Sequence, residues 1–243
     1  MPPVQMKANV RSGPQGREYD AIADRVAADR PRHVLDWGAG HGQVTARLLQ
    51  RGIAVTAYDY EPDAPAGRRP LGHADAEVDH SPDPVALPYP DGTFDAVLSC
   101  GVLEHVADPD ASLDELHRVL SPGGRLYVYK LPNRASYLEW LARRLGLYYH
   151  GKLPHDEVYT EASASALLGR HGFAVRELRT ANVLPLTAVG QRRRATELVW
   201  RANVALASAP GVARVATNVE AIADRLERTP ADRPDSRAVA YAD

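Results

Sequence analysis

Three glycines, Gly38, Gly40 and Gly42, follow a short apolar run that ends at Asp36. Glycine adopts positive φ angles and lets a ligand approach the backbone closely. A helical pattern begins directly after the third glycine, and the free amides of a helix N-terminus favour an anionic group. The dinucleotide fingerprint G-x-G-x-x-G is one residue longer than this spacing. The segment predicts a cofactor site at a strand–turn–helix junction, with an ordinary tight turn as the alternative.

Two acids follow later apolar stretches. Asp59 ends the stretch 53–59, at nearly the interval at which α/β nucleotide sites place a ribose-binding carboxylate. An ionised carboxylate has two acceptor oxygens and no donor, so Asp59 can accept from both ribose hydroxyls; a turn-capping aspartate is the alternative. Asp79 ends the stretch 76–79, where an acid can accept from an adenine amine, and Asp83 is its rival.

One histidine, His105, follows an apolar strand that ends at Cys100. Ligands of open α/β sheets bind at the carboxyl ends of the strands. The unperturbed histidine pKa, near 6.5, suits proton removal at neutral pH. We therefore expect His105 to act as a general base, and a hydrogen-bonded structural histidine is the alternative.

Aromatic and titratable residues mix in the segment 148–157, just before another helical pattern. This position suits one wall of an acceptor pocket, and a polar loop is the alternative. The residues assigned to this wall and to the preceding strand end are Asn133, Tyr149, His150 and His155. Two histidines five residues apart with no cysteine nearby are weak evidence for a metal, and we expect none.

The elements that position these residues follow from apolar spacing and from glycine and proline punctuation. Predicted strands cover residues 34–36, 53–59, 76–79, a stretch ending at Cys100, 125–129 and 173–179. Predicted helices cover residues 18–29, 43–51, a segment capped by Asp110, 136–145 and 160–170. Tyr19 lies near the start of the first helix, either over the cofactor or against the sheet edge. Prolines and glycines in 61–75 predict a loop or a single turn.

Two arrangements are open for the last strand. A strand at 236–241 would make the helical patterns at 194–208 and 212–228 an insertion, and long insertions are usually functional. The rival is a strand at 183–189 followed by a helical tail. The apolar stripes of the two helices must be buried, and we favour burial against the domain and the acceptor over a second subunit or a membrane surface.

Four segments stand in order over roughly residues 30–130: VLDWGAGHG, AYD, LPYPDGTFDAVLSCGVLEHV and LHRVLSPGGRLYVY. Together they resemble the common bacterial class I S-adenosylmethionine (SAM) methyltransferase domain. The resemblance implies a SAM cofactor and methyl transfer to a small-molecule acceptor, by O- or N-methylation. The cofactor residues expected are Asp36, Gly38, Ala39, Gly40, Gly42, Asp59, Tyr60, Asp79 and Cys100. A SAM-binding protein that does not methylate and an NAD-dependent oxidoreductase are the alternatives.

The same resemblance implies an α/β fold. Its Rossmann-like sheet has seven strands in the order 3-2-1-4-5-7-6, the last antiparallel, with helices on both faces and a helical insertion near the C-terminus. LEHV followed by LPNR is also similar to the ubiquinone-biosynthesis O-methyltransferases. Their metal-binding variant carries Glu-x-x-Glu-His, whereas this chain has Gly101 at the first position, before Glu104 and His105.

The length of 243 residues suits one methyltransferase domain over 1–243. Within it we expect a mobile segment 1–16, a cofactor-binding core 30–130 and acceptor-site or lid elements at 131–160 and 183–230.

Charge and cysteine content narrow the partners. A net charge of −2 gives no electrostatic footprint for nucleic acid. The single cysteine, Cys100, excludes an internal disulfide. No apolar run approaches the roughly 18 residues of a membrane span, so no stable membrane insertion is expected. We expect a cytoplasmic protein, with a homodimer left open.

Overall fold

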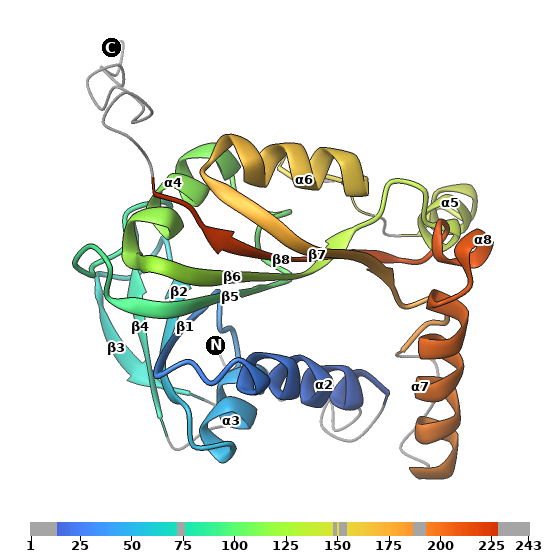
Figure 1. Ribbon diagram of the computed structural model, residues 1–243, viewed down its shortest axis with the longest axis horizontal. Helices are drawn as coiled ribbons and strands as arrows, with labels where there is room; N and C mark the ends of the chain where they lie inside the picture. Colours follow the sequence, from blue (N-terminus) through green and yellow to red (C-terminus); the bar gives the residue numbers. More distant parts are fainter. Residues whose placement is uncertain (1–13, 72–75, 148–149, 151–154, 187–192, 228–243) are drawn as a thin grey trace.

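A mixed sheet of eight strands forms the centre of the computed structural model, which describes residues 14–71, 76–147, 150, 155–186 and 193–227 (Figure 1). The strands are β1 (His33–Trp37), β2 (Ala54–Tyr60), β3 (Gly67–Pro70), β4 (Glu77–Ser81), β5 (Phe94–Cys100), β6 (Leu120–Pro132), β7 (Phe173–Ala181) and β8 (Asn218–Arg225). The helices are α2 (Pro14–Ala28), α3 (Gln43–Gln50), α4 (Pro109–Val119), α5 (Tyr137–Arg144), α6 (Glu161–Arg170), α7 (Arg193–Ala207) and α8 (Pro210–Ala213).

The strand order is β3-β4-β2-β1-β5-β6-β8-β7. Strands β4, β2, β1, β5 and β6 are parallel, and β8 runs antiparallel to both of its neighbours. The predicted fold class is therefore confirmed, although the sheet has one strand more than expected. Helices α2 and α3 lie on one face of the sheet, and α4 and α6 lie on the other (Figure 1).

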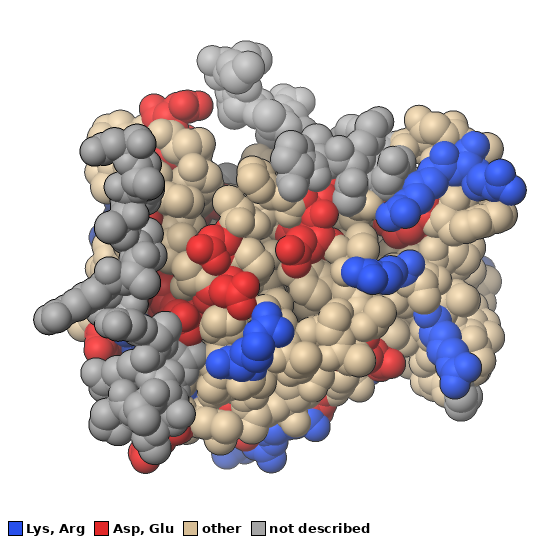
Figure 2. Space-filling model, turned by 90° about the horizontal axis from the view of Figure 1, so that it is seen from above, with Lys and Arg blue, Asp and Glu red and all other residues tan. Residues whose placement is uncertain are grey.

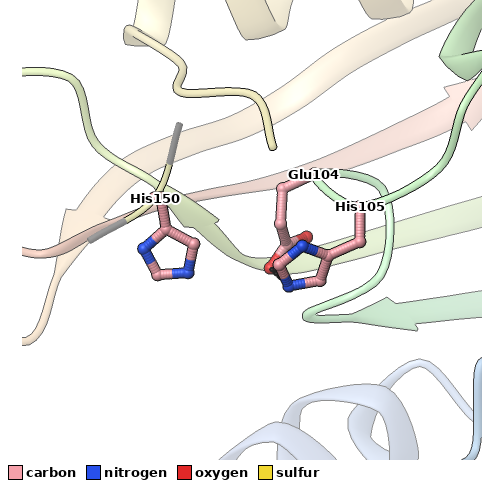
Figure 3. Close-up of side chains that lie close together, drawn as sticks. All are labelled: Glu104, His105 and His150. Atoms are coloured by element: carbon pink, nitrogen blue, oxygen red, sulfur yellow. Dashed lines mark ion pairs between the residues drawn. The ribbon is translucent and has the colours of Figure 1, made fainter. Parts of the chain in front are cut away.

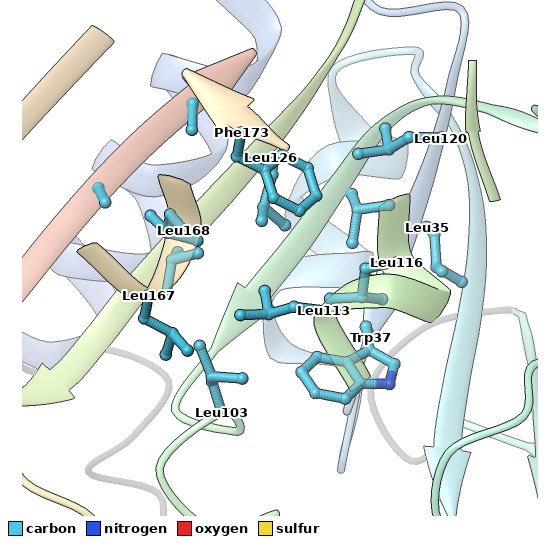
Figure 4. Packing of buried hydrophobic residues seen from close by; sticks show 14 of the residues in the cluster. Leu35, Trp37, Leu103, Leu113, Leu116, Leu120, Leu126, Leu167, Leu168 and Phe173 are labelled. Atoms are coloured by element: carbon cyan, nitrogen blue, oxygen red, sulfur yellow. The ribbon is translucent and has the colours of Figure 1, made fainter. Parts of the chain in front are cut away.

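Each face of the sheet carries its own apolar core. Alternate residues of a strand point to opposite faces, so Val34 packs with Ile22 and Leu48 under α2 and α3. Leu35 belongs to the opposite cluster, which contains Leu116 and the other residues of Figure 4. Because both faces are covered, the central strands read as continuous apolar runs.

The additional strand, β3, corrects the expectation of a loop over 61–75. It pairs antiparallel with β4 at the edge of the sheet. Pro70 ends β3, and proline is tolerated on an edge strand because its missing N–H need not pair. Arg68 on β3 reaches across to Asp79 on β4, with 2.6 Å between Nε and Oδ1.

The end of the described chain corrects a second expectation. Residues 212–227 contain the end of the short α8 and the strand β8, where a long helix was predicted over 212–228. Five consecutive residues from Val219 to Ala223 are buried, because β8 lies between β6 and β7 with both of its faces covered. Such a run has no distinctive period, so apolar spacing alone does not separate a strand from a helix. The rival strand is also absent over 183–186; 187–189 and 236–241 lie outside the described residues.

Two smaller expectations change at helix ends. Pro14, Gln15 and Gly16 belong to α2 rather than to a mobile segment, and residues 1–13 lie outside the described residues. Asp108, not Asp110, caps α4: its Oδ1 accepts from the Ala111 amide at 2.9 Å. Proline has no N–H to lose at the first helical position, so the residue before Pro109 becomes the cap.

Candidate functional site

The turn between β1 and α3 places three glycines in the left-handed region. The φ angles of Gly38, Gly40 and Gly42 are +75°, +55° and +77°. A Cβ on Gly38 would lie 2.3 Å from Cγ2 of Val102, because the segment after β5 packs directly on the turn. A Cβ on Gly40 would meet no protein atom within 4 Å. The first glycine thus permits close packing, and the second faces open space.

A pocket of about 350 Å³ lies beside this turn, at the carboxyl ends of β1 and β5. Its lining consists of Gln15, Tyr19, Asp36, Gly38, Ala39, Gly40, His41, Gln43, Val44 and Cys100. Five of the nine predicted cofactor residues are therefore brought together around one hollow. Helix α2 supplies Gln15 and Tyr19, so it forms the wall opposite the turn.

A largely buried lysine, Lys130, contacts Tyr19 in this wall. The Nζ atom of Lys130 lies 4.1 Å from the centre of the Tyr19 ring and 2.9 Å from Oε2 of Glu18. Lys130 lies within a register shift of β6 and has a φ of +67°, an uncommon angle for a residue with a side chain. Burial lowers the pKa of Lys130, but Glu18, Cys100 and Tyr19 together outweigh this effect, and the pKa is raised. The ion pair therefore ties α2 to the sheet.

Asp36 lies beneath the turn and is buried. The hydroxyl of Thr45 donates to its Oδ2 at 2.5 Å, which links β1 to α3. Burial raises the pKa of Asp36 to about 6, with the Thr45 hydrogen bond opposing and the Asp59 charge adding to the rise. The folded protein thus holds a proton at Asp36 more tightly than the unfolded chain does, where the pKa is about 3.9.

This shift predicts a pH-dependent stability. The stabilisation from protonated Asp36 is full below about pH 3.9 and is lost as the pH rises through about 6. In Asp36→Asn the side chain is neutral at every pH, so this variant has no such loss. Its midpoint of urea unfolding should therefore fall less than the wild-type midpoint between pH 5 and pH 8. Urea unfolding curves at both pH values measure this; equal falls in the two proteins would contradict it.

Asp59, at the carboxyl end of β2, lies against the glycine turn outside the pocket lining. Its carboxylate accepts from the backbone amides of Gly40 and Tyr60. Burial raises the pKa of Asp59, while Arg69 on β3 lowers it from 3.9 Å away. Arg69 was not among the predicted site residues, because β3 was not expected.

We predict that Asp59→Ala weakens SAM binding by roughly 1.5–3 kcal/mol, the value of hydrogen bonds to a charged group. Isothermal titration calorimetry with SAM measures the loss. Glu61→Ala is the matched control, because Glu61 also pairs with Arg69, at 3.1 Å, but makes no contact with the turn. Equal affinities in Asp59→Ala and wild type would reduce Asp59 to a residue that ends a strand.

A second group of polar residues surrounds His105, beyond the end of β5. Nδ1 of His105 forms a hydrogen bond with Oδ1 of Asp156, with 3.0 Å between the two atoms. Nε2 of the same ring lies 3.8 Å from Oε1 of Glu104. The ring of His150 stacks on that of His105 with 5.9 Å between centres, and Figure 3 shows the two rings beside Glu104. Glu139 of α5 makes two hydrogen bonds with His150. Its Oε1 lies 2.7 Å from Nδ1 of the ring, and its Oε2 accepts from the backbone amide at 2.8 Å.

Glu104 is buried in this group. Its Oε2 atom makes no hydrogen bond to any residue that the structure describes. Burial raises the pKa of Glu104 to about 7, with the His105 charge opposing the rise. A Cβ on Gly101 would lie 3.6 Å from Oε1 of Glu104, so the carboxylate lies against the strand end that Cys100 closes. The His105 group thus adjoins the pocket.

Besides Asp59, three predicted cofactor residues are not part of the pocket lining. Gly42 caps α3, and Tyr60 is 48% exposed at the end of β2. Asp79 has both oxygens engaged, by Arg68 and by the hydroxyl of Tyr89, because β3 covers this edge. Its contact to an adenine stays a prediction.

The predicted acceptor residues are only partly brought together. His150 joins His105, whereas His155 is exposed in a turn and Tyr149 lies outside the described residues. The buried Asn133 amide donates to the carbonyls of residues 214 and 216, and its oxygen accepts from the amide of residue 135. Asn133 therefore ties β6 to the segment after α8.

Helix α7, predicted to form part of a lid or wall over the acceptor, packs beside α2. Arg17 and Glu197 join the two helices at 3.4 Å. Residues of α2, α7, β7 and β8 enclose a second cavity of about 460 Å³, which shares no lining residue with the first. No described helix combines the length and apolar character that crossing a bilayer requires. On the face shown in Figure 2, acidic and basic side chains are interspersed without one continuous basic surface.

Comparison with known proteins identifies a family model and several relatives that are similar to this chain. The model of a family described as a methyltransferase domain matches residues 35–128. An uncharacterized methyltransferase of Mycobacterium bovis is 34% identical over 147 residues, which are 57% of this chain and 73% of that protein. A demethylmenaquinone methyltransferase of Thermus thermophilus is 40% identical over 113 residues, which are 45% of this chain and 51% of that protein. The chain thus spans about half the length of that relative.

A solved structure shares the fold. It is the 1,6-didemethyltoxoflavin-N1-methyltransferase of Burkholderia thailandensis with bound 1,6-didemethyltoxoflavin and S-adenosylhomocysteine. The match covers 87% of this chain and 78% of that one, with a TM-score of 0.52 and 21% identity. At this identity the likeness concerns the fold.

Proposed function

The chain belongs to the class I SAM-dependent methyltransferase family, and from this premise we propose that it transfers a methyl group to a small-molecule hydroxyl acceptor. SAM is the cofactor of this family. The observation that carries the proposal is the pocket beside the glycine turn, where a bare Gly40 faces open space.

The residues of the pocket fit SAM. SAM supplies an electrophilic methyl group on a sulfonium. In the proposed complex, Gly38 and Gly40 let the cofactor approach the backbone, and Asp59 accepts from the ribose hydroxyls. Tyr19, held by Lys130, covers the pocket from α2 and keeps water out. Correct placement of both reactants can supply roughly 7–11 kcal/mol of the barrier.

His105 is the proposed general base. An ionised Asp156 can only accept, so Nδ1 of His105 carries the hydrogen and Nε2 keeps its lone pair. Nε2 then removes the proton of an acceptor hydroxyl, and Asp156 stabilises the imidazolium that forms. The side chain of His105 is 45% exposed, so an acceptor can reach it. A hydroxyl gains more from such a base than an amine that is already deprotonated.

Transfer of a labelled methyl group tests the proposal. The purified protein is incubated with methyl-labelled SAM and panels of phenols, amines and carboxylates. Demethylated quinone precursors come first, because similar relatives are named for them. We expect label in a hydroxyl-bearing acceptor. SAM binding without transfer to any acceptor would favour a SAM-binding protein that does not methylate.

A further inference from the structure

We propose that Glu104, His105 and His150 form a binding site for a divalent cation of the zinc type. One ligand atom from each residue lies within 4.8 Å of the other two. Nε2 of His105 and Oε1 of Glu104 are 3.8 Å apart. Two ligands of a tetrahedral zinc are roughly 3.3 Å apart, as bonds of about 2.0–2.1 Å require. The ligand atoms must therefore approach one another by up to about 1.5 Å, and rotation of the exposed His105 ring supplies part of this movement.

The two histidines are oriented as metal ligands are. Asp156 holds Nδ1 of His105, and Glu139 holds Nδ1 of His150. Carboxylates accept hydrogen bonds, so both rings carry the hydrogen on Nδ1 and present Nε2 as the donor of a lone pair. Figure 3 shows the His150 ring directed toward His105. Metal-binding histidines almost always make such a bond to a carboxylate, carbonyl or water with their other nitrogen.

Glu104 supplies an independent indication of a ligand. Only 3% of its surface is exposed, and its Oε2 makes no hydrogen bond to the described residues. A buried carboxylate oxygen without a partner is costly, and a cation removes that cost. The side chain lies beside His105, so a cation there contacts both.

Separate chain segments hold the ligands in place. Glu104 and His105 follow β5, whereas His150 follows α5. The amide of Glu157 donates to the carbonyl of Glu104 at 2.9 Å, which joins the segment of Asp156 to the first two ligands. Two imidazoles and one carboxylate form the donor set of zinc sites that leave a fourth position open. The expectation of no metal came from the spacing of His150 and His155 and from Gly101, which stands where the metal-binding variant has a carboxylate. In the fold, His150 supplies a third ligand that no local motif contains.

A cation held by these three residues would have a fourth position open, where an acceptor oxygen could bind. The cation would lower the pKa of that acceptor hydroxyl, so the acceptor would lose its proton without a base. This role rests on the proposed methyl transfer, whereas the binding site does not. Nε2 of His105 has one lone pair, which takes either a proton or the cation. Metal occupancy would thus replace the base function of His105 rather than add to it.

Metal titration of the untagged, chelator-treated protein tests the site without SAM or acceptor. We expect one equivalent of Co²⁺ to bind, with the visible absorption of four-coordinate cobalt, and one equivalent of Zn²⁺ to displace it. His150→Gln should weaken Co²⁺ binding by at least about 100-fold, and Glu139→Gln by roughly 10–100-fold. His171→Gln is the control, because carboxylates hold both of its ring nitrogens away from the cluster.

Absence of one-equivalent binding, or equal Co²⁺ affinity in wild type and His150→Gln, would overturn the proposal. Circular dichroism establishes that each variant folds, and Glu139→Gln decides the matter if His150→Gln does not. Because the titration contains no cofactor, failure of methyl transfer leaves its outcome unaffected, and failure of metal binding leaves the SAM pocket unaffected.

Discussion

Gly40→Val is expected to lower SAM affinity by at least about 100-fold, which corresponds to about 2.8 kcal/mol. Gly40 lines the pocket, and a Cβ at this position points into space that no protein atom fills. In the bound state the cofactor takes up that space, so the isopropyl group of valine must displace it. Calorimetric titration with SAM measures the effect.

Gly52→Val is the matched control for backbone strain. Gly52 also has a positive φ, +75°, and its Cβ would also meet no atom within 4 Å, but it lies at the far end of α3. Each valine costs at least roughly 1–2 kcal/mol of stability in the left-handed region. Both variants should therefore unfold more easily, and only Gly40→Val should lose SAM. A loss of SAM affinity in both variants would attribute the effect to strain.

His105→Ala is expected to lower kcat by on the order of 10²–10⁴-fold with little change in SAM affinity. The variant removes the Nε2 lone pair and leaves the glycine turn intact. Single-turnover assays with labelled SAM and a saturating acceptor measure the rate. Asp156→Asn should give a smaller loss, because the ring stays but its orientation is no longer fixed.

His171→Ala serves as the control, since His171 lies between Asp110 and Asp114 and contacts none of the His105 group. An unchanged kcat in His105→Ala would leave positioning of the reactants as the whole of the mechanism. A loss in His105→Ala fits both the base and the metal ligand, because each uses Nε2. The cobalt titration separates those two roles.

Local patterns predicted the elements that surround the glycine turn. The positions of the strands along the chain and the turn at Gly38 follow from short-range signals, in which an apolar run is ended by glycine. The order of the strands within the sheet was implied by the family resemblance instead. The position of Asp59 against Gly40 also follows, because parallel strands end at one edge of the sheet.

The acceptor side depends on contacts between distant segments, which no local pattern contains. His150 was assigned to a pocket wall, but its pairing with Glu139 and its stacking on His105 appear only in the fold. Asp156 was one acid in a charged run. Lys130 offered a signal that was not used, as a lone cation after the apolar run of β6.

The prediction of a long C-terminal helix was wrong for a physical reason. Val219 and Ile222 are three residues apart, a spacing that suits the face of a helix. In the fold they belong to different cores on opposite faces of β8. Since β8 is buried on both sides, its pattern carries no alternation that identifies a strand.

Calorimetric titration of the wild-type protein with SAM, S-adenosylhomocysteine and NAD tests the central claim most directly. The pocket beside Gly38 and Gly40 should bind SAM and S-adenosylhomocysteine with one-to-one stoichiometry and should not bind NAD. Binding of NAD in place of SAM would contradict the account and return the glycine turn to the dinucleotide class.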